Sequence, residues 1–204
     1  MKEIILGKSK PVHIAYILFM FMIGCTTTVV RYNLSLTDVE RPADTARRYG
    51  ETIIDQVLEN DTTKYKFTDS LIEILFLTNY KQFEFILTNK TSHSIKIIWD
   101  EAAFIDGDGI SKRVIHSGIK YNERSAPQPV SVVAKGSSIS DLLCPADNVY
   151  LDSYFGWMAN PIITEADIGK TVQLLLPFEI EGVVNEYLFR FKINNVTVEQ
   201  INTY

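Results

Sequence analysis

The sequence predicts an all-β protein built as a two-sheet antiparallel β-sandwich. Three observations carry this prediction: apolar and polar residues alternate over short runs, turn-prone residues separate the runs, and about seven such runs occur along the 204 residues. An alternation with a period of two places every second side chain on one face of a strand, which is the pattern of a half-buried strand. Hydrophobic residues make up 46% of the chain and charged residues 22%, so a packed core is feasible.

The chain begins with a segment that is typical of a secretory signal. Lys2, Lys8 and Lys10 provide a positive start, and the uninterrupted apolar run Ile14–Ile23 follows. A transmembrane helix needs about 20 apolar residues, whereas a run of about ten fits the core of a signal peptide. We therefore expect a signal helix in residues 1–24 that is removed from the mature chain.

A cysteine follows this segment directly. The tetrapeptide Met22-Ile23-Gly24-Cys25 resembles the lipoprotein box of bacterial lipoproteins, in which a small residue precedes a cysteine that is lipidated and becomes the first residue of the mature chain. The resemblance implies that Cys25 carries acyl chains and that the membrane is a partner through this lipid. Two alternatives remain open, namely an uncleaved anchor that extends to Val30 and an ordinary secretory signal.

The charge balance argues against a nucleic-acid partner. The formal net charge is −5, and the loss of residues 1–24 with three Lys and one Glu would change it to −7. A nucleic-acid-binding domain needs clustered Lys and Arg, and an acidic body is not attracted to anionic lipid. The lipid must therefore do the anchoring. From the uncharged Thr26, the lipoprotein resemblance further implies the outer membrane and its periplasmic face.

Residues 25–62 are interpreted as a lipidated tether followed by a short helix. Thr26–Pro42 shows no strong period, and apolar residues after it recur at helical spacing. Pro42 stands where a helix could begin, although Gly50 weakens a helix by about 1 kcal/mol. The stretch Ile53–Leu58 fits a first strand equally well.

Residues 63–200 are predicted to form the β-sandwich domain. Its clearest hairpin is expected within Gln82–Asp106, where the apolar runs Phe83–Leu87 and Ile95–Trp99 flank polar residues. A second hairpin is expected at 172–193, where Pro177 indicates an edge strand or a bulge. The other predicted features are strands at Tyr65–Phe67 and Leu71–Leu77, a turn at Gly107–Gly109, a strand at Arg113–His116, and an irregular Pro-rich segment at 121–169 with element-like runs at Val130–Val133 and Ser138–Leu143.

The order of these features resembles a known kind of domain. An apolar strand, an Asn-Lys-Thr turn, a long strand and an Asp-Gly turn are similar to the immunoglobulin-like domains of many small bacterial lipoproteins. The resemblance covers Tyr65–Asn194. It implies an immunoglobulin-like sandwich, and it brings no catalytic residue with it.

Few residues are candidates for catalysis or metal binding. His13 lies in the signal segment, His93 in a turn and His116 near a strand end, and no His-x-x-x-His or Cys-x-x-Cys spacing supports a zinc site. We therefore expect no metal and no cofactor. A hydrolase of envelope polymers would need His116 beside an acidic neighbour such as Asp100. Cys144 is interpreted as a small buried hydrophobic residue.

The candidate binding surface is an aromatic group in the irregular segment: Tyr150, Tyr154, Phe155 and Trp157. Aromatic residues exposed on loops mark binding sites, although the same residues could cap one end of the core. We expect a non-catalytic envelope protein that binds or assembles with an envelope protein or polymer. The alternative is a carbohydrate- or peptide-binding lipoprotein that uses this aromatic loop.

Overall fold

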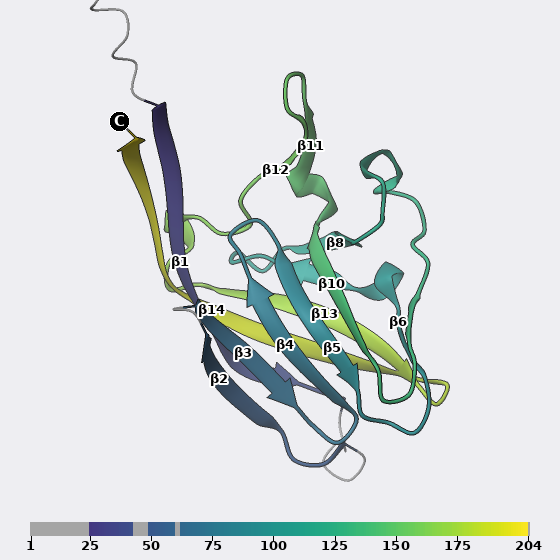
Figure 1. Cartoon of the computed structure of the whole chain (residues 1–204). Coiled ribbons are helices and arrows are strands. Elements are labelled where there is room, and N and C mark those ends of the chain that lie inside the picture. Colours follow the sequence, from purple (N-terminus) through teal and green to yellow (C-terminus); the bar gives the residue numbers. More distant parts are fainter. Residues whose placement is uncertain (1–24, 43–48, 60–61, 204) are drawn as a thin grey trace, which may run out of the picture. The chain divides into compact units, whose positions relative to one another are not determined.

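The computed structural model describes residues 25–42, 49–59 and 62–203 (Figure 1). The chain divides into two units, Val30–Thr197 and a smaller unit made of the two chain ends. In the smaller unit, Cys25–Val29 and the end of the chain up to Thr203 are extended strand. The expected signal helix lies outside the described residues.

The prediction of an all-β protein is confirmed. The strands of the described residues are β1 (Cys25–Glu40), β2 (Ile53–Glu59), β3 (Thr62–Thr68), β4 (Ile72–Thr78), β5 (Phe83–Asn89), β6 (Ile95–Ile97), β7 (Ala103–Ile105), β8 (Ser111–His116), β9 (Ser131–Val133), β10 (Ser138–Pro145), β11 (Val149–Asp152), β12 (Gly156–Ala159), β13 (Thr171–Ile180) and β14 (Val183–Thr203). Four short 3-10 turns connect some of them: η2 (Trp99–Glu101), η3 (Tyr121–Glu123), η4 (Ala146–Asn148) and η5 (Glu165–Asp167).

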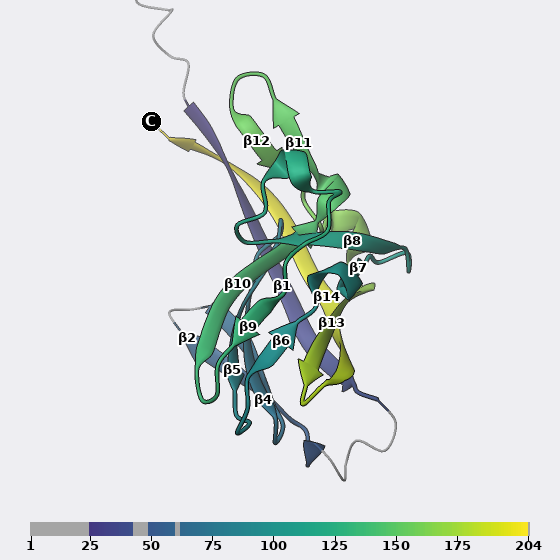
Figure 2. The same cartoon turned by 90° about the vertical axis from the view of Figure 1, so that its right-hand side faces the viewer.

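Most of the described strands belong to one antiparallel sheet that is nearly closed. Its order is β1-β14-β13-β7-β8-β10-β5-β4-β3-β2, and β6 pairs with both β13 and β9. Two separate sheets were expected. The difference arises at β8, because Ser111–Arg113 pair with β7 while Val114–His116 pair with β10. One strand therefore belongs to both halves and joins them (Figure 2).

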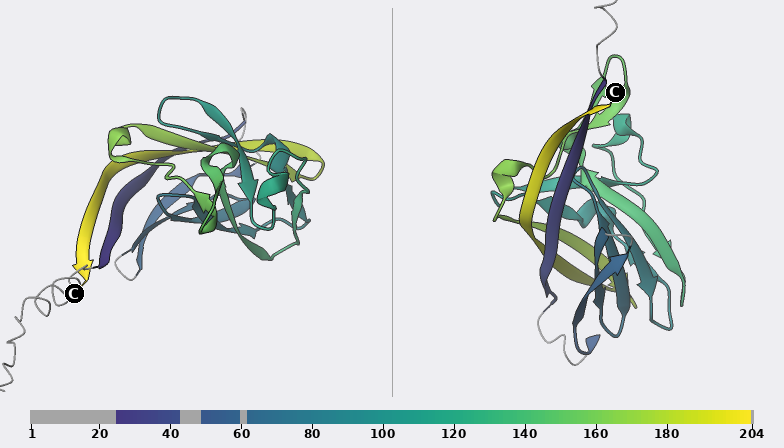
Figure 3. Two further views of the ribbon diagram at one scale, coloured as in Figure 1. Left: turned by 90° about the horizontal axis from the view of Figure 1, so that it is seen from above. Right: turned by 60° about the vertical axis from the view of Figure 1, so that its left-hand side comes forward.

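The core lies between the two halves of this sheet and is rich in aromatic rings. Phe76 of β4 contacts Phe189 and Phe191 of β14, with ring centroids 4.9 and 5.0 Å apart and the rings edge to face. Phe83 of β5 lies 5.0 Å from Phe191. Each such pair contributes about 0.5–1.5 kcal/mol beyond the area it buries. The β3–β5 half and the β13–β14 half are thus held face to face (Figure 3).

The segment that was interpreted as a tether is strand β1, and this corrects the prediction for 25–42. Leu34 and Leu36 are buried, and Val30 and Tyr32 pack against the same core. These four residues alternate with polar ones, which is the strand pattern that the sequence already contains. β1 pairs with β14, and Thr37 Oγ1 donates a hydrogen bond of 3.1 Å across this pair to the backbone oxygen of a β14 residue.

The helix expected before the sandwich is corrected from Ile53 onward, where the alternative of a first strand is confirmed, whereas Tyr49 is helical. Ile53–Glu59 forms β2 and pairs with β3 along its whole length. Gly50 adopts a φ of 69°, a conformation that interrupts a helix at little cost to glycine. The rest of the predicted helix, residues 43–48, lies outside the described residues.

The expected hairpin within Gln82–Asp106 does not form. β5 pairs with β4 and β10, whereas β6 pairs with β13 and β9. The turn between β5 and β6 carries the chain from one half of the sheet to the other. Asn89, which is buried, stabilises this crossing because its Nδ2 donates to the carbonyl oxygens of His93, Val133 and Ala134.

Two other hairpins are confirmed. β7 and β8 pair through the predicted Asp-Gly turn, and β13 pairs with β14 from Thr171 to Ile180. Pro177, however, lies on an inner strand rather than at an edge. β13 pairs with β7 at 173–175 and with β6 at 178–180. Pro177, which has no backbone N–H to donate, lies between these two paired segments.

Candidate functional site

The clearest candidate site is a separate two-stranded sheet formed by β11 and β12, which we call the aromatic hairpin (residues 149–159). In its register Tyr150 lies opposite Met158, and Leu151 lies opposite Trp157. Figure 1 shows this hairpin projecting above β8 and β10. No strands were predicted here from the sequence, because the Pro and Gly residues around the segment are typical of turns and loops.

All four aromatic residues of the candidate surface are exposed. Tyr154 is 91% exposed and Phe155 79%, while Tyr150 and Trp157 are each about two-fifths exposed. Leu151 adds a further exposed apolar side chain between them. Tyr154 and Phe155 therefore do not cap the core, whereas Tyr150 and Trp157 are partly covered. Apolar side chains gathered in this way on a projecting element are typical of an interaction site.

The tip of the aromatic hairpin is held by its own carboxylate. Asp152 Oδ1 accepts hydrogen bonds from the backbone amides of Tyr154 at 2.8 Å and Phe155 at 2.9 Å. These two bonds lower the pKa of Asp152 because they stabilise its charged form. Gly156 closes the turn with a φ of 76°. The two tip aromatics are thus displayed on a backbone that is already ordered.

The base of the aromatic hairpin is tied to the main sheet by a small apolar cluster. Val149 is buried against Ile115 of β8 and Cys144 of β10. On the hairpin side, Tyr121 of η3 contacts Trp157, with ring centroids 5.0 Å apart at 35°. We call these two rings the Tyr121–Trp157 platform. It gives one side of the hairpin a pair of tilted rings, and Tyr121 packs against the apolar cluster at the hairpin base.

An open pocket of about 610 Å³ lies between β8, η4 and the residues that follow η3. Lys112, Arg113 and Arg124 line it together with Asp147. The basic groups already have partners: Arg113 bonds to the Asp100 carboxylate at 2.7 Å, and Lys112 lies 3.8 Å from that of Asp147. The pocket is therefore polar rather than strongly cationic.

His116 does not meet the acidic residue that the hydrolase hypothesis named. Its Nδ1 lies 3.2 Å from Asp141 Oδ2, and its ring stacks on Trp99 with centroids 4.1 Å apart. Asp100 instead pairs with Arg113. His116 Nε2 is buried and has no hydrogen-bond partner among the described residues. A general base must reach its substrate, so this buried pair has the hydrogen bonding of a catalytic dyad without the access.

Cys144 is buried, as the sequence predicted. Burial raises the pKa of its thiol to about 11. The reactive form of a cysteine is the thiolate, so Cys144 is a packing residue of the hairpin base rather than a nucleophile.

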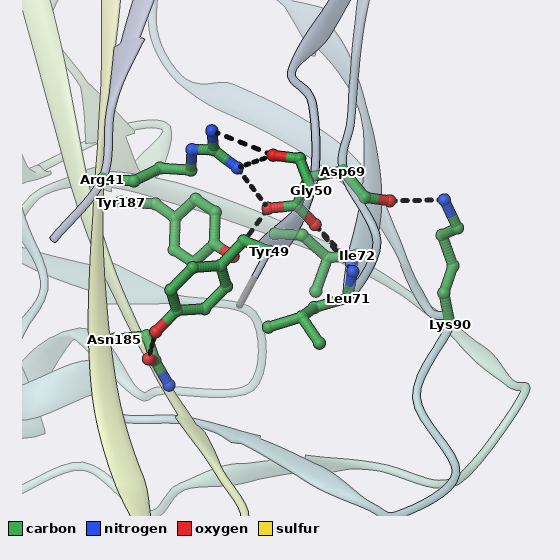
Figure 4. A network of polar contacts seen from close by, with 9 residues as sticks. All are labelled: Arg41, Tyr49, Gly50, Asp69, Leu71, Ile72, Lys90, Asn185 and Tyr187. Atoms are coloured by element: carbon green, nitrogen blue, oxygen red, sulfur yellow. Dashed lines mark hydrogen bonds and ion pairs between the residues drawn. The ribbon is translucent and has the colours of Figure 1, made fainter. Parts of the chain in front are cut away.

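A buried polar network, which sequence reasoning missed, is centred on Asp69 (Figure 4). Asp69 Oδ1 accepts the backbone amides of Leu71 and Ile72, at 2.8 and 2.9 Å. Asp69 Oδ2 accepts hydrogen bonds from Tyr187 Oη at 2.9 Å and from Arg41 Nη1 at 3.3 Å. Every acceptor position is engaged inside the protein, so we interpret this carboxylate as structural.

Other kinds of site find no support in the described part of the chain. No group of three His, Cys, Asp or Glu side chains is placed there to hold a metal ion. Within the same residues, none of the helices has the length and apolar character needed to cross a bilayer. Nothing is described of the side chain of Cys25, so its proposed lipid stays a prediction.

Comparison with models of protein families, with curated proteins and with solved structures found no match to this chain.

Proposed function

We propose that this chain is a lipid-anchored, non-catalytic binding module of the cell envelope, which holds an envelope protein or polymer through the sides of its aromatic hairpin. The observation that carries the proposal is the Tyr121–Trp157 platform. Trp157 keeps about two-fifths of its surface exposed although its ring contacts that of Tyr121. Trp and Tyr are the residue types that contribute most binding energy in protein interfaces.

The anchor in this proposal is the lipid on Cys25, at the periplasmic face of an outer membrane. Each methylene of a buried acyl chain contributes about 0.8 kcal/mol, so two or three chains hold a protein stably at a bilayer. The lipoprotein-like tetrapeptide that ends at Cys25 supports this part of the proposal. The immunoglobulin-like relationship of 65–194 also belongs to the proposal, and the face-to-face packing of the two sheet halves is compatible with it.

A second candidate function is the binding of a carbohydrate or a peptide on the same platform. Two tilted rings at 35° form a shallow aromatic surface, and aromatic faces pack well on apolar faces of other molecules. The polar pocket lined by Arg124 and Ser125 could receive hydroxyl or carbonyl groups of such a ligand, and Arg124 Nη1 donates at 3.0 Å to the backbone oxygen of Tyr121. Glycan arrays and peptide libraries distinguish this candidate from a protein partner.

Photo-crosslinking in living cells tests the main proposal. A photoreactive residue at Leu151, which lies opposite Trp157 in the register, should capture a discrete envelope component. The same residue at Val132 of β9, which is similarly exposed, should not. The product should disappear when Trp157→Ala is added. Equal capture from both positions, or a product that survives Trp157→Ala, would contradict the proposal.

A further inference from the structure

We propose that the tip of the aromatic hairpin, formed by Tyr154 and Phe155, inserts into the surface of the lipid bilayer that holds Cys25. The inference rests on the proposed lipid anchor, since the anchor decides which surface the tip meets. It assigns a different role to each part of the aromatic hairpin: the tip contacts lipid, and the Tyr121–Trp157 platform on its side remains available to a partner.

The tip has the chemistry of a residue pair that settles at a membrane interface. Ser153, Tyr154 and Phe155 carry no charge, and the two aromatic side chains are the most exposed of the aromatic hairpin. Tyr and other amphipathic aromatic residues are enriched where the acyl chains meet the headgroups. Backbone groups are costly to bring into lipid without partners. The Asp152 carboxylate already bonds the amides of Tyr154 and Phe155, which lowers that cost.

Within Val30–Thr197, the base of the aromatic hairpin and the Val30–Tyr32 part of β1 lie at the same end. Tyr32 of β1 contacts Tyr80, with ring centroids 6.3 Å apart. The carbonyl oxygen of Tyr80 accepts the amide of Ile162 at 2.8 Å, and the amide of Asn160 donates at 2.9 Å to the carbonyl of Asn148, the residue before β11. Figures 1 and 2 show the hairpin rising from this end.

The length of chain outside this unit matches the reach of the hairpin. Cys25–Val29 separates the lipid attachment site from Val30 by five residue steps, which span at most about 17 Å when extended. Each strand of the aromatic hairpin has four residues, so its tip extends on the order of 13 Å from its base. A lipid on Cys25 would therefore keep this end of the unit near the bilayer, within reach of Tyr154 and Phe155.

A bilayer fits the tip better than a folded protein does. An aromatic side chain buries about 150–250 Å², so the two tip residues together offer well below the roughly 800 Å² per partner of a standard protein interface. A lipid surface needs no such area or shape. The acidic body is not attracted to anionic headgroups, so tip insertion should change little with salt concentration.

Tryptophan fluorescence tests the tip directly, because the chain has two tryptophans and Trp99 is fully buried. The full chain, purified from its membrane, is reconstituted into vesicles of phosphatidylethanolamine and phosphatidylglycerol with brominated acyl chains. The tip reporter carries Phe155→Trp and Trp157→Phe. The matched control carries Val132→Trp and Trp157→Phe, so its reporter lies on β9. This strand is far from the hairpin base: the carbonyl oxygen of Val133 accepts a hydrogen bond from Asn89, which ends β5, whereas Tyr80 precedes the start of β5.

We expect the brominated lipid to quench at least half of the Phe155→Trp emission and to leave the Val132→Trp emission unchanged, with iodide quenching showing the reverse order. Two results would overturn the inference if the protein still floats with the vesicles. In the first, iodide quenches the tip reporter and brominated lipid does not. In the second, neither quenches it, which means that a protein partner covers the tip. If neither the parent chain nor Cys25→Ala floats with the vesicles, the proposed lipid anchor is wrong, and the inference is wrong with it.

Discussion

Tyr187 Oη donates a hydrogen bond of 2.9 Å to Asp69 Oδ2, although 118 positions separate the two residues in the sequence. Tyr187 lies on β14 and Asp69 in the turn between β3 and β4, so the bond joins the two halves of the sheet. Burial and the Asp69 charge raise the pKa of Tyr187, which keeps the hydroxyl a donor. Arg41, just after β1, bonds to the same carboxylate oxygen.

Replacement of Asp69 by Asn should destabilise the protein without changing its surface. Asn cannot accept as strongly from Arg41, and hydrogen bonds to charged groups contribute about 1.5–3 kcal/mol each. We expect the free energy of unfolding in urea to fall by that amount. Asp108→Asn is the matched control, because Asp108 is exposed and pairs with Lys170 at the surface; its effect should stay below about 1 kcal/mol. Equal effects of both changes would contradict the structural role of Asp69.

The two tryptophans should respond to substitution in opposite ways. Trp99 is fully buried and its Nε1 donates to Ser131 at 2.8 Å, so Trp99→Ala should cost about 3–5 kcal/mol of stability. Trp157→Ala should leave the midpoint of urea unfolding nearly unchanged and abolish the crosslink from Leu151. Thermal and urea unfolding measure the first effect, and cell crosslinking measures the second. A large loss of stability in Trp157→Ala would return this residue to a packing role.

The thiol of Cys144 should be inert in the folded protein. In a Cys25→Ala variant it is the sole thiol, and a pKa of about 11 leaves only on the order of one part in a thousand as thiolate at pH 8. We expect a disulfide reagent to react at once with an added Val132→Cys and to reach Cys144 only as urea unfolds the chain. Fast labelling of native Cys144 would contradict its burial.

The Cys144 thiol should also make the free energy of unfolding depend on pH in the alkaline range. Burial raises the pKa of Cys144 from 9.0 to about 11, so the folded state binds the proton more tightly than the unfolded state does. Its contribution is present below pH 9 and is lost as the pH rises through 11. Urea unfolding at pH 8 and pH 10.5 should therefore show a smaller pH-dependent loss in Cys144→Ala than in the parent. An equal loss in both would mean that other groups account for it.

Asp152→Ala should loosen the tip of the aromatic hairpin while the rest of the fold stays intact. The change removes the acceptor of the Tyr154 and Phe155 amides. Hydrogen exchange at these two amides should accelerate, whereas exchange in β13 and β14 should not. Asp147→Ala, which removes an exposed carboxylate at the hairpin base, is the control. Unchanged exchange at the tip would show that the turn does not depend on Asp152.

The strands that could be predicted from the sequence are those whose partners are close in the chain. β13 and β14 alternate clearly and meet through Glu181 and Gly182, which both have positive φ, so pattern and turn agree. The Asp-Gly turn between β7 and β8 is a similar case. In β1, Val30 and Leu34 already follow the alternation of a strand, but a segment directly after a lipidated cysteine is expected to be a tether, and the strand was therefore not predicted.

The features that could not be predicted depend on partners far away in the sequence. Phe83–Leu87 is a strand, as its pattern predicts, yet its partners are β4 and β10 rather than the next apolar run, because the turn held by Asn89 leads the chain to the other half of the sheet. A local pattern contains no information about that choice. The Asp69 network could not be predicted for the same reason, because Tyr187 and Arg41 lie far from Asp69 in the sequence. Of the candidate site, the aromatic residues were visible in the sequence, but their display on a hairpin was not.

The mass of the N-terminal peptide tests the proposed lipid anchor on Cys25 most directly. The peptide is taken from protein extracted out of its native membrane, beside a Cys25→Ala variant. We expect residues 1–24 to be gone and Cys25 to carry a diacyl- or triacyl-glyceryl group. An unmodified Cys25 with the early lysines still attached would contradict it, and the anchor would then be an uncleaved segment.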